Sequence, residues 1–302
     1  AMLSQTVQNY IEARRAAGFK FAAQAGLLRS FAAYAEARGE HYVRASTAIE
    51  WAGRVAKVPQ RARRLWAVTR FARHARVDDP RHEVPPPAFG GAGCPRRTPY
   101  ILSQDEITRL LQAARSYGKN PLLGATYGTL FGLLACTGLR ISEAIRLRQS
   151  DITSDGLLIR NTKFRKSRLV ALHDSARAAL EQYLSQRQAL APRDDHVFVS
   201  SRGTPLIQEC LDGVFRELVK RVGLPLGPDL PRITPHSLRH TFAVRSLQSC
   251  PDGRERIARH MVALSTYLGH VDAAATYWYL QATPELLRDI ASCCECHVEN
   301  AS

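Results

Sequence analysis

The sequence has 302 residues, which is long enough for two domains with hydrophobic cores of their own. Lys and Arg number 42 against 27 Asp and Glu, and this net charge of +15 favours a polyanionic partner such as a nucleic acid, because each neutralised phosphate releases condensed counterions. No apolar run approaches the roughly 20 residues that span a bilayer, the first residues lack a signal-peptide pattern and the 7 cysteines are scattered, so we expect a cytoplasmic protein with reduced thiols and no membrane partner.

Residues 1–84 are predicted to form a small, basic, all-helical domain. Alanine is frequent, apolar residues recur at helical spacing, and Thr47 is expected to cap a helix that runs through Trp51. Lys57, Arg61 and Arg64 have the spacing of one helical face. They are therefore candidate contacts with a nucleic acid, although a solvated basic face would have the same spacing.

The segment 85–99 is predicted to be an extended linker, because three prolines at its start and three glycines up to Gly93 cannot continue a helix. A second domain of helices and strands is predicted over residues 100–292. It opens with a capping box formed by Ser103 and Glu106. An almost wholly apolar helix over 122–135 follows, and Gly138 ends or bends it.

Two strands are predicted in the second domain, at 157–161 and 168–172, with a basic hairpin turn at 162–167 between them. Thr234, followed by a proline, begins a later helix, and a last helix is predicted at 284–292. The expected fold is mainly α with a small antiparallel β-sheet. The tail, 293–302, has cysteines and a histidine at a spacing too tight for an ordinary zinc site, so we expect no metal.

The candidate reactive residues lie on these elements. Arg140 follows the glycine that ends the apolar helix, and His236 and Arg239 are three residues apart, so they share one helical face. His270 precedes Tyr279 by nine residues.

These residue types suit an attack on a phosphodiester. The attack adds negative charge to the non-bridging oxygens, and guanidinium groups stabilise it because they never lose their own charge. A tyrosine phenol can attack and stay attached, and its pKa of about 10 makes it a better leaving group than an alkoxide, so the step is reversible. Histidine and lysine can move the protons. Each residue alone also has an ordinary structural explanation, and it is their order and grouping that favour cutting of a DNA strand without a metal.

Together these motifs resemble the tyrosine recombinases of the phage-integrase family. The resemblance covers residues from about 100 to 290 and lies in residues 137–143, Lys163, residues 236–240, residues 268–270 and Tyr279. The N-terminal part is similar to the family's helical core-binding domain in length and helicity only. The resemblance therefore implies a helical core-binding domain followed by a mixed α/β catalytic domain.

The resemblance implies six catalytic residues: Arg140, Lys163, His236, Arg239, His270 and Tyr279. The two arginines would clamp the scissile phosphate, and the lysine, the first on its turn, would be the general acid. The histidine at 236 would assist proton transfer, and the histidine at 270 would hydrogen-bond the phosphate. The tyrosine would be the nucleophile and would form a 3′-phosphotyrosine bond.

Two of these assignments have rivals. Tyr277 is a second phenol close to Tyr279, and the nine-residue interval from the histidine decides for Tyr279. The family commonly has glycine before the turn lysine, whereas this chain has Thr162, which leaves Lys166 as the alternative to Lys163.

Other residues are expected to support the site or to contact DNA. Arg165, Lys166 and Arg168, on and after the turn, are candidate DNA contacts, and Glu143 is expected to support Arg140 rather than react. The family implies double-stranded DNA as partner, a homotetramer on two DNA sites, other recombinases as further partners and no cofactor. It also implies integration, excision or transposition of a mobile element. A type IB topoisomerase and a catalytically idle DNA-binding protein remain the alternatives.

Overall fold

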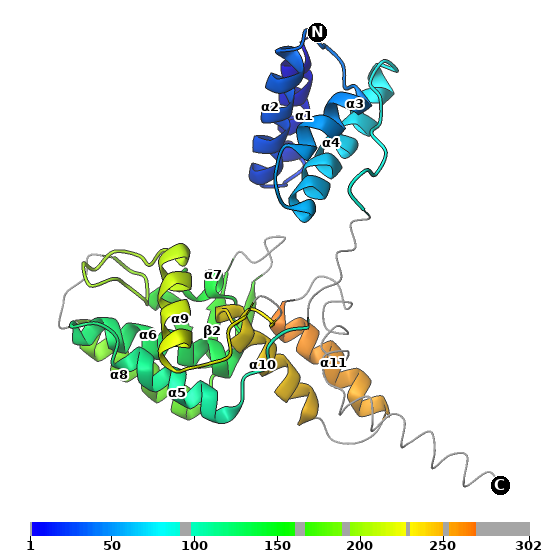
Figure 1. Ribbon diagram of the computed structural model, residues 1–302. Helices are drawn as coiled ribbons and strands as arrows, with labels where there is room; N and C mark the ends of the chain where they lie inside the picture. The colour runs from blue at the N-terminus through cyan, green and yellow to red at the C-terminus, as the bar shows by residue number, and fades with distance from the viewer. Residues whose placement is uncertain are drawn as a thin grey trace. The chain divides into compact units, whose positions relative to one another are not determined.

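The computed structural model describes residues 2–90, 98–160, 167–188, 194–227, 230–249 and 254–269, and the chain divides into two compact units, 1–96 and 97–302 (Figure 1). The described residues are mostly helical, with one small antiparallel sheet, which confirms the predicted fold class. Within these ranges, no helix has both the length and the apolar character needed to cross a membrane.

The first unit is a bundle of helices around an apolar core, and its described part contains no strand. Aromatic rings fill the centre of the core, where Phe31 packs edge-on against Trp51 and Tyr10 packs against Phe71. Its helices are α1 (Leu3–Ala16), α2 (Ala22–Glu36), α3 (Ala45–Gly53) and α4 (Val58–Asp78).

The predicted cap at Thr47 is wrong. Helix α3 begins two residues earlier, at Ala45, and the Thr47 hydroxyl instead donates to Glu40 at 2.7 Å. The first backbone N–H of the helix, at Ala45, donates to the carboxylate of Glu83 at 2.8 Å. A residue 38 positions away therefore satisfies this helix end.

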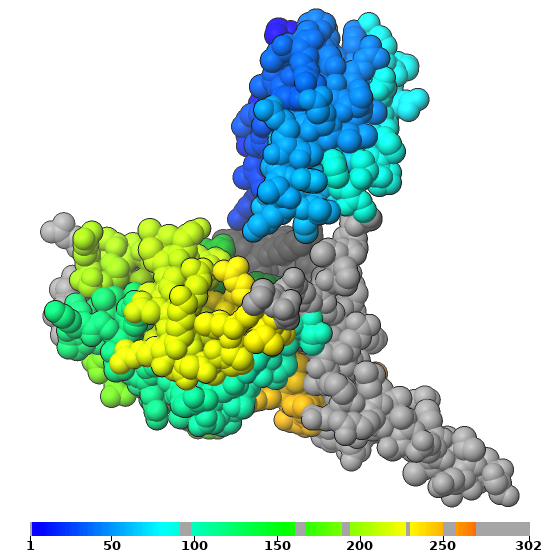
Figure 2. All heavy atoms as spheres, viewed as in Figure 1, coloured from blue at the N-terminus to red at the C-terminus, as the bar shows by residue number. Residues whose placement is uncertain are grey.

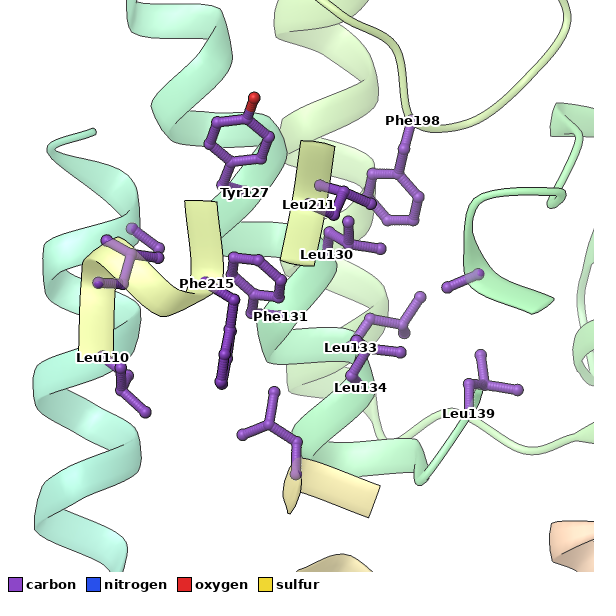
Figure 3. Packing of buried hydrophobic residues seen from close by; sticks show 14 of the residues in the cluster. Leu110, Tyr127, Leu130, Phe131, Leu133, Leu134, Leu139, Phe198, Leu211 and Phe215 are labelled. Carbon is purple, nitrogen blue, oxygen red and sulfur yellow. The ribbon is translucent and has the colours of Figure 1, made fainter. Parts of the chain in front are cut away.

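The second unit is built around one apolar helix, α6 (Pro121–Thr137). This helix is apolar on all sides because other helices surround it, as expected for a buried helix. Phe131 of α6 meets Phe215 edge-on at 5.1 Å between ring centroids, within the apolar cluster of Figure 3. The helices packed on α6 include α5 (Gln104–Arg115), α8 (Asp174–Gln188) and α10 (Pro235–Gln248).

The remaining helices lie at the margins of this core. Helix α9 (Gln208–Arg221) packs on α5, and Figure 2 shows one face of the unit, on which α9 and the residues after it lie over α5. Helix α11 (Arg254–Leu268) packs against α10. Two short turns of helix follow α6, namely α7 (Ile141–Ala144) and the 3₁₀ turn η1 (Gln149–Asp151).

Two predicted helix boundaries of this unit are confirmed. Ser103 Oγ accepts from the N–H of Glu106 at 3.1 Å and the Glu106 carboxylate accepts from the N–H of Ser103 at 2.7 Å, which is the predicted capping box. Helix α6 ends at Gly138, whose φ of +63° is left-handed. A Cβ at Gly138 would lie 2.5 Å from Phe242 Cδ1, so both the backbone and the packing require glycine.

The sheet has the order β1–β2–β3, with antiparallel neighbours. The strands are β1 (Ile152–Thr153), β2 (Gly156–Ile159) and β3 (Arg168–Val170), and Ile159 pairs with Arg168. The two predicted strands are thus confirmed as β2 and β3, and each is shorter than predicted. The sequence did not indicate β1, because two residues cannot show an alternating pattern. Residues 162–166 of the hairpin turn predicted at 162–167, the helix predicted at 284–292 and the tail lie outside the described residues.

Candidate active site

The left-handed end of α6 places Arg140 at the start of α7. Gly138 turns the chain and Leu139 is buried, so the next residue leaves the core as the N-cap of α7. The side chain of Arg140 is 30% exposed. Its guanidinium therefore lies at the edge of the core, where a ligand can reach it.

Arg239 reaches the same place from α10. It is 1% exposed, and burial of a charge requires compensating polar partners. Its Nη1 donates to the carbonyl of Gly138 at 2.6 Å and its Nη2 to the carbonyl of Leu268 at 2.8 Å. These two bonds join α10 to the ends of α6 and α11.

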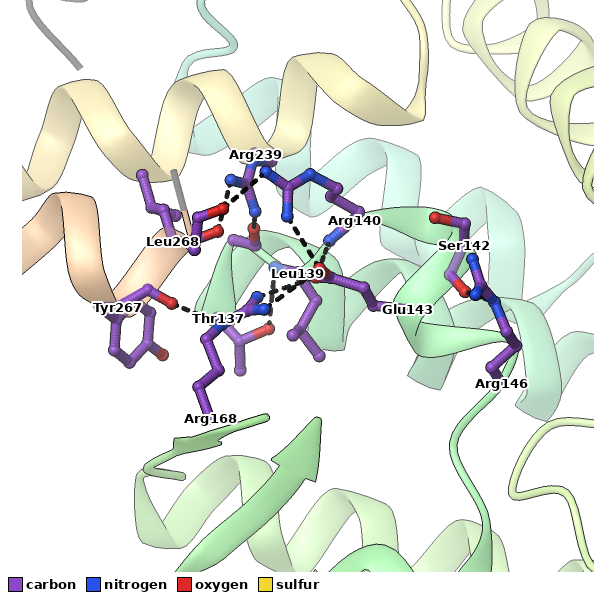
Figure 4. Close-up of polar contacts among 12 residues, drawn as sticks. Thr137, Leu139, Arg140, Ser142, Glu143, Arg146, Arg168, Arg239, Tyr267 and Leu268 are labelled. Atoms are coloured by element: carbon purple, nitrogen blue, oxygen red, sulfur yellow. Dashed lines mark hydrogen bonds and ion pairs between the residues drawn. The ribbon is translucent and has the colours of Figure 1, made fainter. Parts of the chain in front are cut away.

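Three arginines meet at the end of α11 (Figure 4). The carbonyls of Tyr267, Leu268 and Gly269 accept, in that order, from Arg168 Nε at 2.7 Å, Arg239 Nη2 at 2.8 Å and Arg140 Nη2 at 3.1 Å. Carbonyls at a helix C-terminus have no partner within the helix and carry partial negative charge. The helix end therefore holds positive groups from three separate elements close to one another.

Glu143 is the anion of this cluster, and its side chain is 8% exposed. Its carboxylate accepts from Arg140 Nη1 at 2.8 Å and from the backbone N–H of Arg140 at 3.0 Å. Arg168 donates to the same carboxylate with Nη1 at 3.1 Å and Nη2 at 2.8 Å. Burial alone would raise the pKa of Glu143, but the hydrogen bonds and charges of Arg168 and Arg140 outweigh it and lower the pKa to about 2.

His236 lies in the first turn of α10 and is exposed to solvent. Its ring meets the ring of His240 edge-on at 4.4 Å between centroids. Desolvation by the surrounding protein and the positive charges of Arg239 and Arg140 lower the pKa of His236. Because His236 keeps contact with water, we expect the charges of the two arginines, rather than desolvation, to be the main cause of its lowered pKa. A lowered pKa makes the ring neutral at pH 7 and able to accept a proton.

The structure brings together Arg140, His236 and Arg239 of the six predicted catalytic residues. Lys163, His270 and Tyr279 lie outside the described residues, as do Arg165 and Lys166. The described chain ends at Gly269, whose carbonyl accepts from Arg140, and His270 is the next residue in the sequence.

Arg168 is not placed as a DNA contact requires. Its side chain is 12% exposed, and its Nε, Nη1 and Nη2 are all hydrogen-bonded within the protein. Leu169, the next residue of β3, is 49% exposed, and Val170 is buried. The strand therefore turns the arginine inward and the leucine outward.

The basic residues predicted at the start of α4 differ in their surroundings. Lys57 precedes the helix and is exposed, whereas Arg61 Nε donates to the carbonyl of Val55 at 2.7 Å. The guanidinium of Arg64 stacks on the ring of Trp51 at 3.9 Å, so this arginine contributes to packing.

Another face of α4 is more open than the predicted one. Arg63, Trp66, Arg70 and Arg73 are exposed and recur at helical spacing, and the guanidinium of Arg70 lies 4.8 Å from the centre of the Trp66 ring. An exposed tryptophan flanked by arginines suits contact with a nucleic acid. The spacing of these four residues was the signal that could have identified this face.

Comparisons with known proteins place the chain among related sequences. Residues 101–285 match the Phage integrase family. A protein of Sinorhizobium fredii named integrase/recombinase y4rB is 38% identical over 94% of this chain and 94% of its own length. Tyrosine recombinase XerD of Caulobacter vibrioides is 34% identical over 76% of this chain and 72% of its own length.

Solved structures with the same fold include two integrases. The Tn1549 transposon integrase in complex with transposon right end DNA has a TM-score of 0.68 at 18% identity and covers 97% of this chain and 99% of that chain. A lambda integrase tetramer bound to a Holliday junction has a TM-score of 0.62 at 18% identity and covers 90% of this chain and 78% of that chain. At this level of identity the likeness concerns the fold.

Proposed function

Since this chain belongs to the phage integrase family, we propose that it is a site-specific recombinase that cuts and rejoins DNA strands through a 3′-phosphotyrosine intermediate. The observation that carries the proposal is the convergence of Arg140 and Arg239 on adjacent carbonyls of one helix end. A scissile phosphate beside them gains two permanent charges that stabilise its five-coordinate state.

The other roles follow from the chemistry of attack. The phenolic oxygen of Tyr279 bonds to phosphorus, and the bond to the 5′-oxygen breaks. Lys163 protonates the departing oxygen as the general acid. His236 is neutral at pH 7 and assists transfer of the phenolic proton, while His270 hydrogen-bonds the phosphate. Because the guanidinium groups supply the charge, no metal takes part.

The two units have different roles, DNA binding in the first and catalysis in the second. The first unit, predicted as residues 1–84, is the core-binding domain, and the exposed arginines of α4 contact the backbone of duplex DNA. The catalytic domain spans 100–292.

The active assembly is a homotetramer on two DNA sites, in line with the lambda integrase tetramer bound to a Holliday junction. Relatives named integrase/recombinase and the fold of a transposon integrase support a role in moving a mobile element.

Covalent capture on DNA tests the proposal. The protein is incubated with nicked duplexes drawn from the DNA that flanks its own gene, in the presence of EDTA, and adducts are resolved by denaturing electrophoresis. We expect the wild-type protein and Tyr277→Phe to become attached and Tyr279→Phe to bind DNA without attachment. An adduct formed by Tyr279→Phe but not by Tyr277→Phe would reverse the choice of nucleophile.

Two further results would contradict the proposal. A wild-type protein that binds these duplexes and never becomes attached is a catalytically idle DNA-binding protein. A protein that relaxes supercoiled plasmid lacking any such site acts as a topoisomerase instead.

A further inference from the structure

Arg168 holds the carboxylate that also holds Arg140. It donates to Glu143 through Nη1 at 3.1 Å and Nη2 at 2.8 Å, a two-bond geometry that only a guanidinium can make. Arg140 bonds the same carboxylate through Nη1 alone, at 2.8 Å, and through its backbone N–H. Both arginines therefore depend on one anion.

Because both arginines bind the Glu143 carboxylate, Arg168 limits how the Arg140 guanidinium can be oriented toward a phosphate. Arg168 occupies one side of the carboxylate with two bonds, so Arg140 is limited to a single side-chain bond there. Without Arg168, the carboxylate would be free to turn and pair with both Nη groups of Arg140. Such pairing would draw the guanidinium toward Glu143 and away from a phosphate, since the same N–H groups cannot serve both anions.

The third hydrogen bond of Arg168 reaches the end of α11, which also holds Arg140. Its Nε donates to the carbonyl of Tyr267 at 2.7 Å, and the next two carbonyls in the chain accept from Arg239 and Arg140. The close fit is visible at Gly269, where an added Cβ would lie 2.9 Å from Arg168 Nη1. One guanidinium thus connects β3 to both Glu143 and the end of α11.

We propose that Arg168 is a positioning residue for strand cleavage, which fixes the Arg140 guanidinium in two ways: through Glu143, and through the end of α11, where the Gly269 carbonyl accepts from Arg140. This inference rests on the proposed recombinase function. An ordinary structural role, in which Arg168 merely anchors β3, predicts a loss of stability that does not depend on Arg140. The two explanations therefore differ in whether the effects of Arg168 and Arg140 are independent.

A double-mutant cycle on the rate of covalent attachment separates them. With the nicked duplex at saturation, we expect Arg168→Ala and Arg168→Lys each to lower the rate about tenfold or more, since lysine keeps the charge and loses the two-bond geometry. In the Arg140→Ala background, Arg168→Ala should lower the rate less than about twofold further, because the group that it positions is gone.

Arg160→Ala is the matched control. Arg160 directly follows β2, the neighbouring strand, and pairs with Asp151, and neither residue bonds to Glu143 in the described structure. Its effect on the rate should be the same with and without Arg140. If Arg168→Ala also lowers the rate by the same factor in both backgrounds, the positioning role is refuted. A loss of DNA affinity as large as the loss of rate refutes it as well, because Arg168 is then a DNA contact.

A measurement without DNA keeps the inference separate from the proposed function. ¹⁵N NMR of the Arg140 guanidinium, assigned with Arg140→Lys, reports rotation about its Cζ–Nε bond. We expect slow rotation in the wild-type protein and in Arg160→Ala, and faster rotation in Arg168→Lys. Unchanged rotation in Arg168→Lys overturns the inference. Faster rotation in a protein that never attaches to DNA supports the positioning of Arg140 and contradicts only the proposed function.

Discussion

Replacement of Glu143 by glutamine tests whether one buried carboxylate stabilises the arginine cluster. Burial would raise its pKa, but the hydrogen bonds and charges of Arg168 and Arg140 lower it to about 2. Compared with an ordinary glutamate pKa of about 4.3, and at about 1.4 kcal/mol per pKa unit, this corresponds to roughly 3 kcal/mol. Because glutamine does not ionise, we expect Glu143→Gln to lower the free energy of unfolding of the second unit by about 3 kcal/mol at pH 7.

The stability of the second unit should also depend on pH, because the same carboxylate titrates in acid. A carboxylate with a lowered pKa in the folded state stabilises the fold above its unfolded-state pKa, and this stabilisation is lost as the pH falls toward the folded-state pKa. The wild-type protein should therefore lose about half of this contribution between pH 7 and pH 3. The Glu143→Gln variant lacks this contribution at every pH. The difference in free energy of unfolding between the two proteins should therefore shrink in acid.

Urea unfolding followed by far-ultraviolet circular dichroism measures both units. In a Trp278→Phe background, the fluorescence of the two remaining tryptophans, Trp51 and Trp66, reports on the first. Glu50→Gln is the matched control. The pKa of Glu50 is also lowered to about 2, mainly by its hydrogen bond to Arg38, but its side chain is 54% exposed. Water screens such a pair, so we expect a far smaller effect. Equal effects of the two variants, or a difference for Glu143→Gln that is the same at pH 7 and pH 3, would refute the reasoning.

Other predictions concern the residues around this carboxylate. Arg239→Ala should lower the rate of covalent attachment by about 10²–10³ while DNA affinity, measured by fluorescence anisotropy, falls less than about tenfold; equal losses would make it a binding contact only. Gly138→Ala should cost about 1–3 kcal/mol in chemical unfolding, from the left-handed φ and the contact with Phe242, and an unchanged stability would show that α6 can end in another way. His236 should titrate in NMR below its usual pKa of about 6.5, and its pKa should rise in Arg140→Ala; an unchanged pKa would mean that the cation does not act on the ring.

Local signals predicted the helix boundaries that depend on local contacts. Ser103 and Glu106 are three residues apart and cap each other, and Gly138 ends α6 because it alone accepts a left-handed φ there. The start of α3 was mispredicted because its partner, Glu83, is distant in the sequence. Spacing along the chain contains no information about such a contact.

The same contrast between local signals and distant contacts applies to the candidate active site. The motifs indicated Arg140 and Arg239, but not what holds them, because their partners at the end of α11 are backbone carbonyls that any residue possesses. Arg168 was predicted to contact DNA because it follows a basic turn. In β3 it shares the inner face with Val170, while Leu169 points outward, which is the reverse of what hydrophobicity predicts. The inward position follows from the buried charge of Glu143, and that pairing depends on the folded structure.

Arg140 and Arg239 donate to neighbouring carbonyls at the end of α11, and this arrangement has a consequence for how activity could be controlled. Carbonyls 268 and 269 are adjacent, so unwinding that turn would break one hydrogen bond of each group at once, while Arg239 keeps its bond to Gly138 and Arg140 its bond to Glu143. Perturbations of the C-terminal end of α11 should therefore affect the two arginines together rather than one at a time.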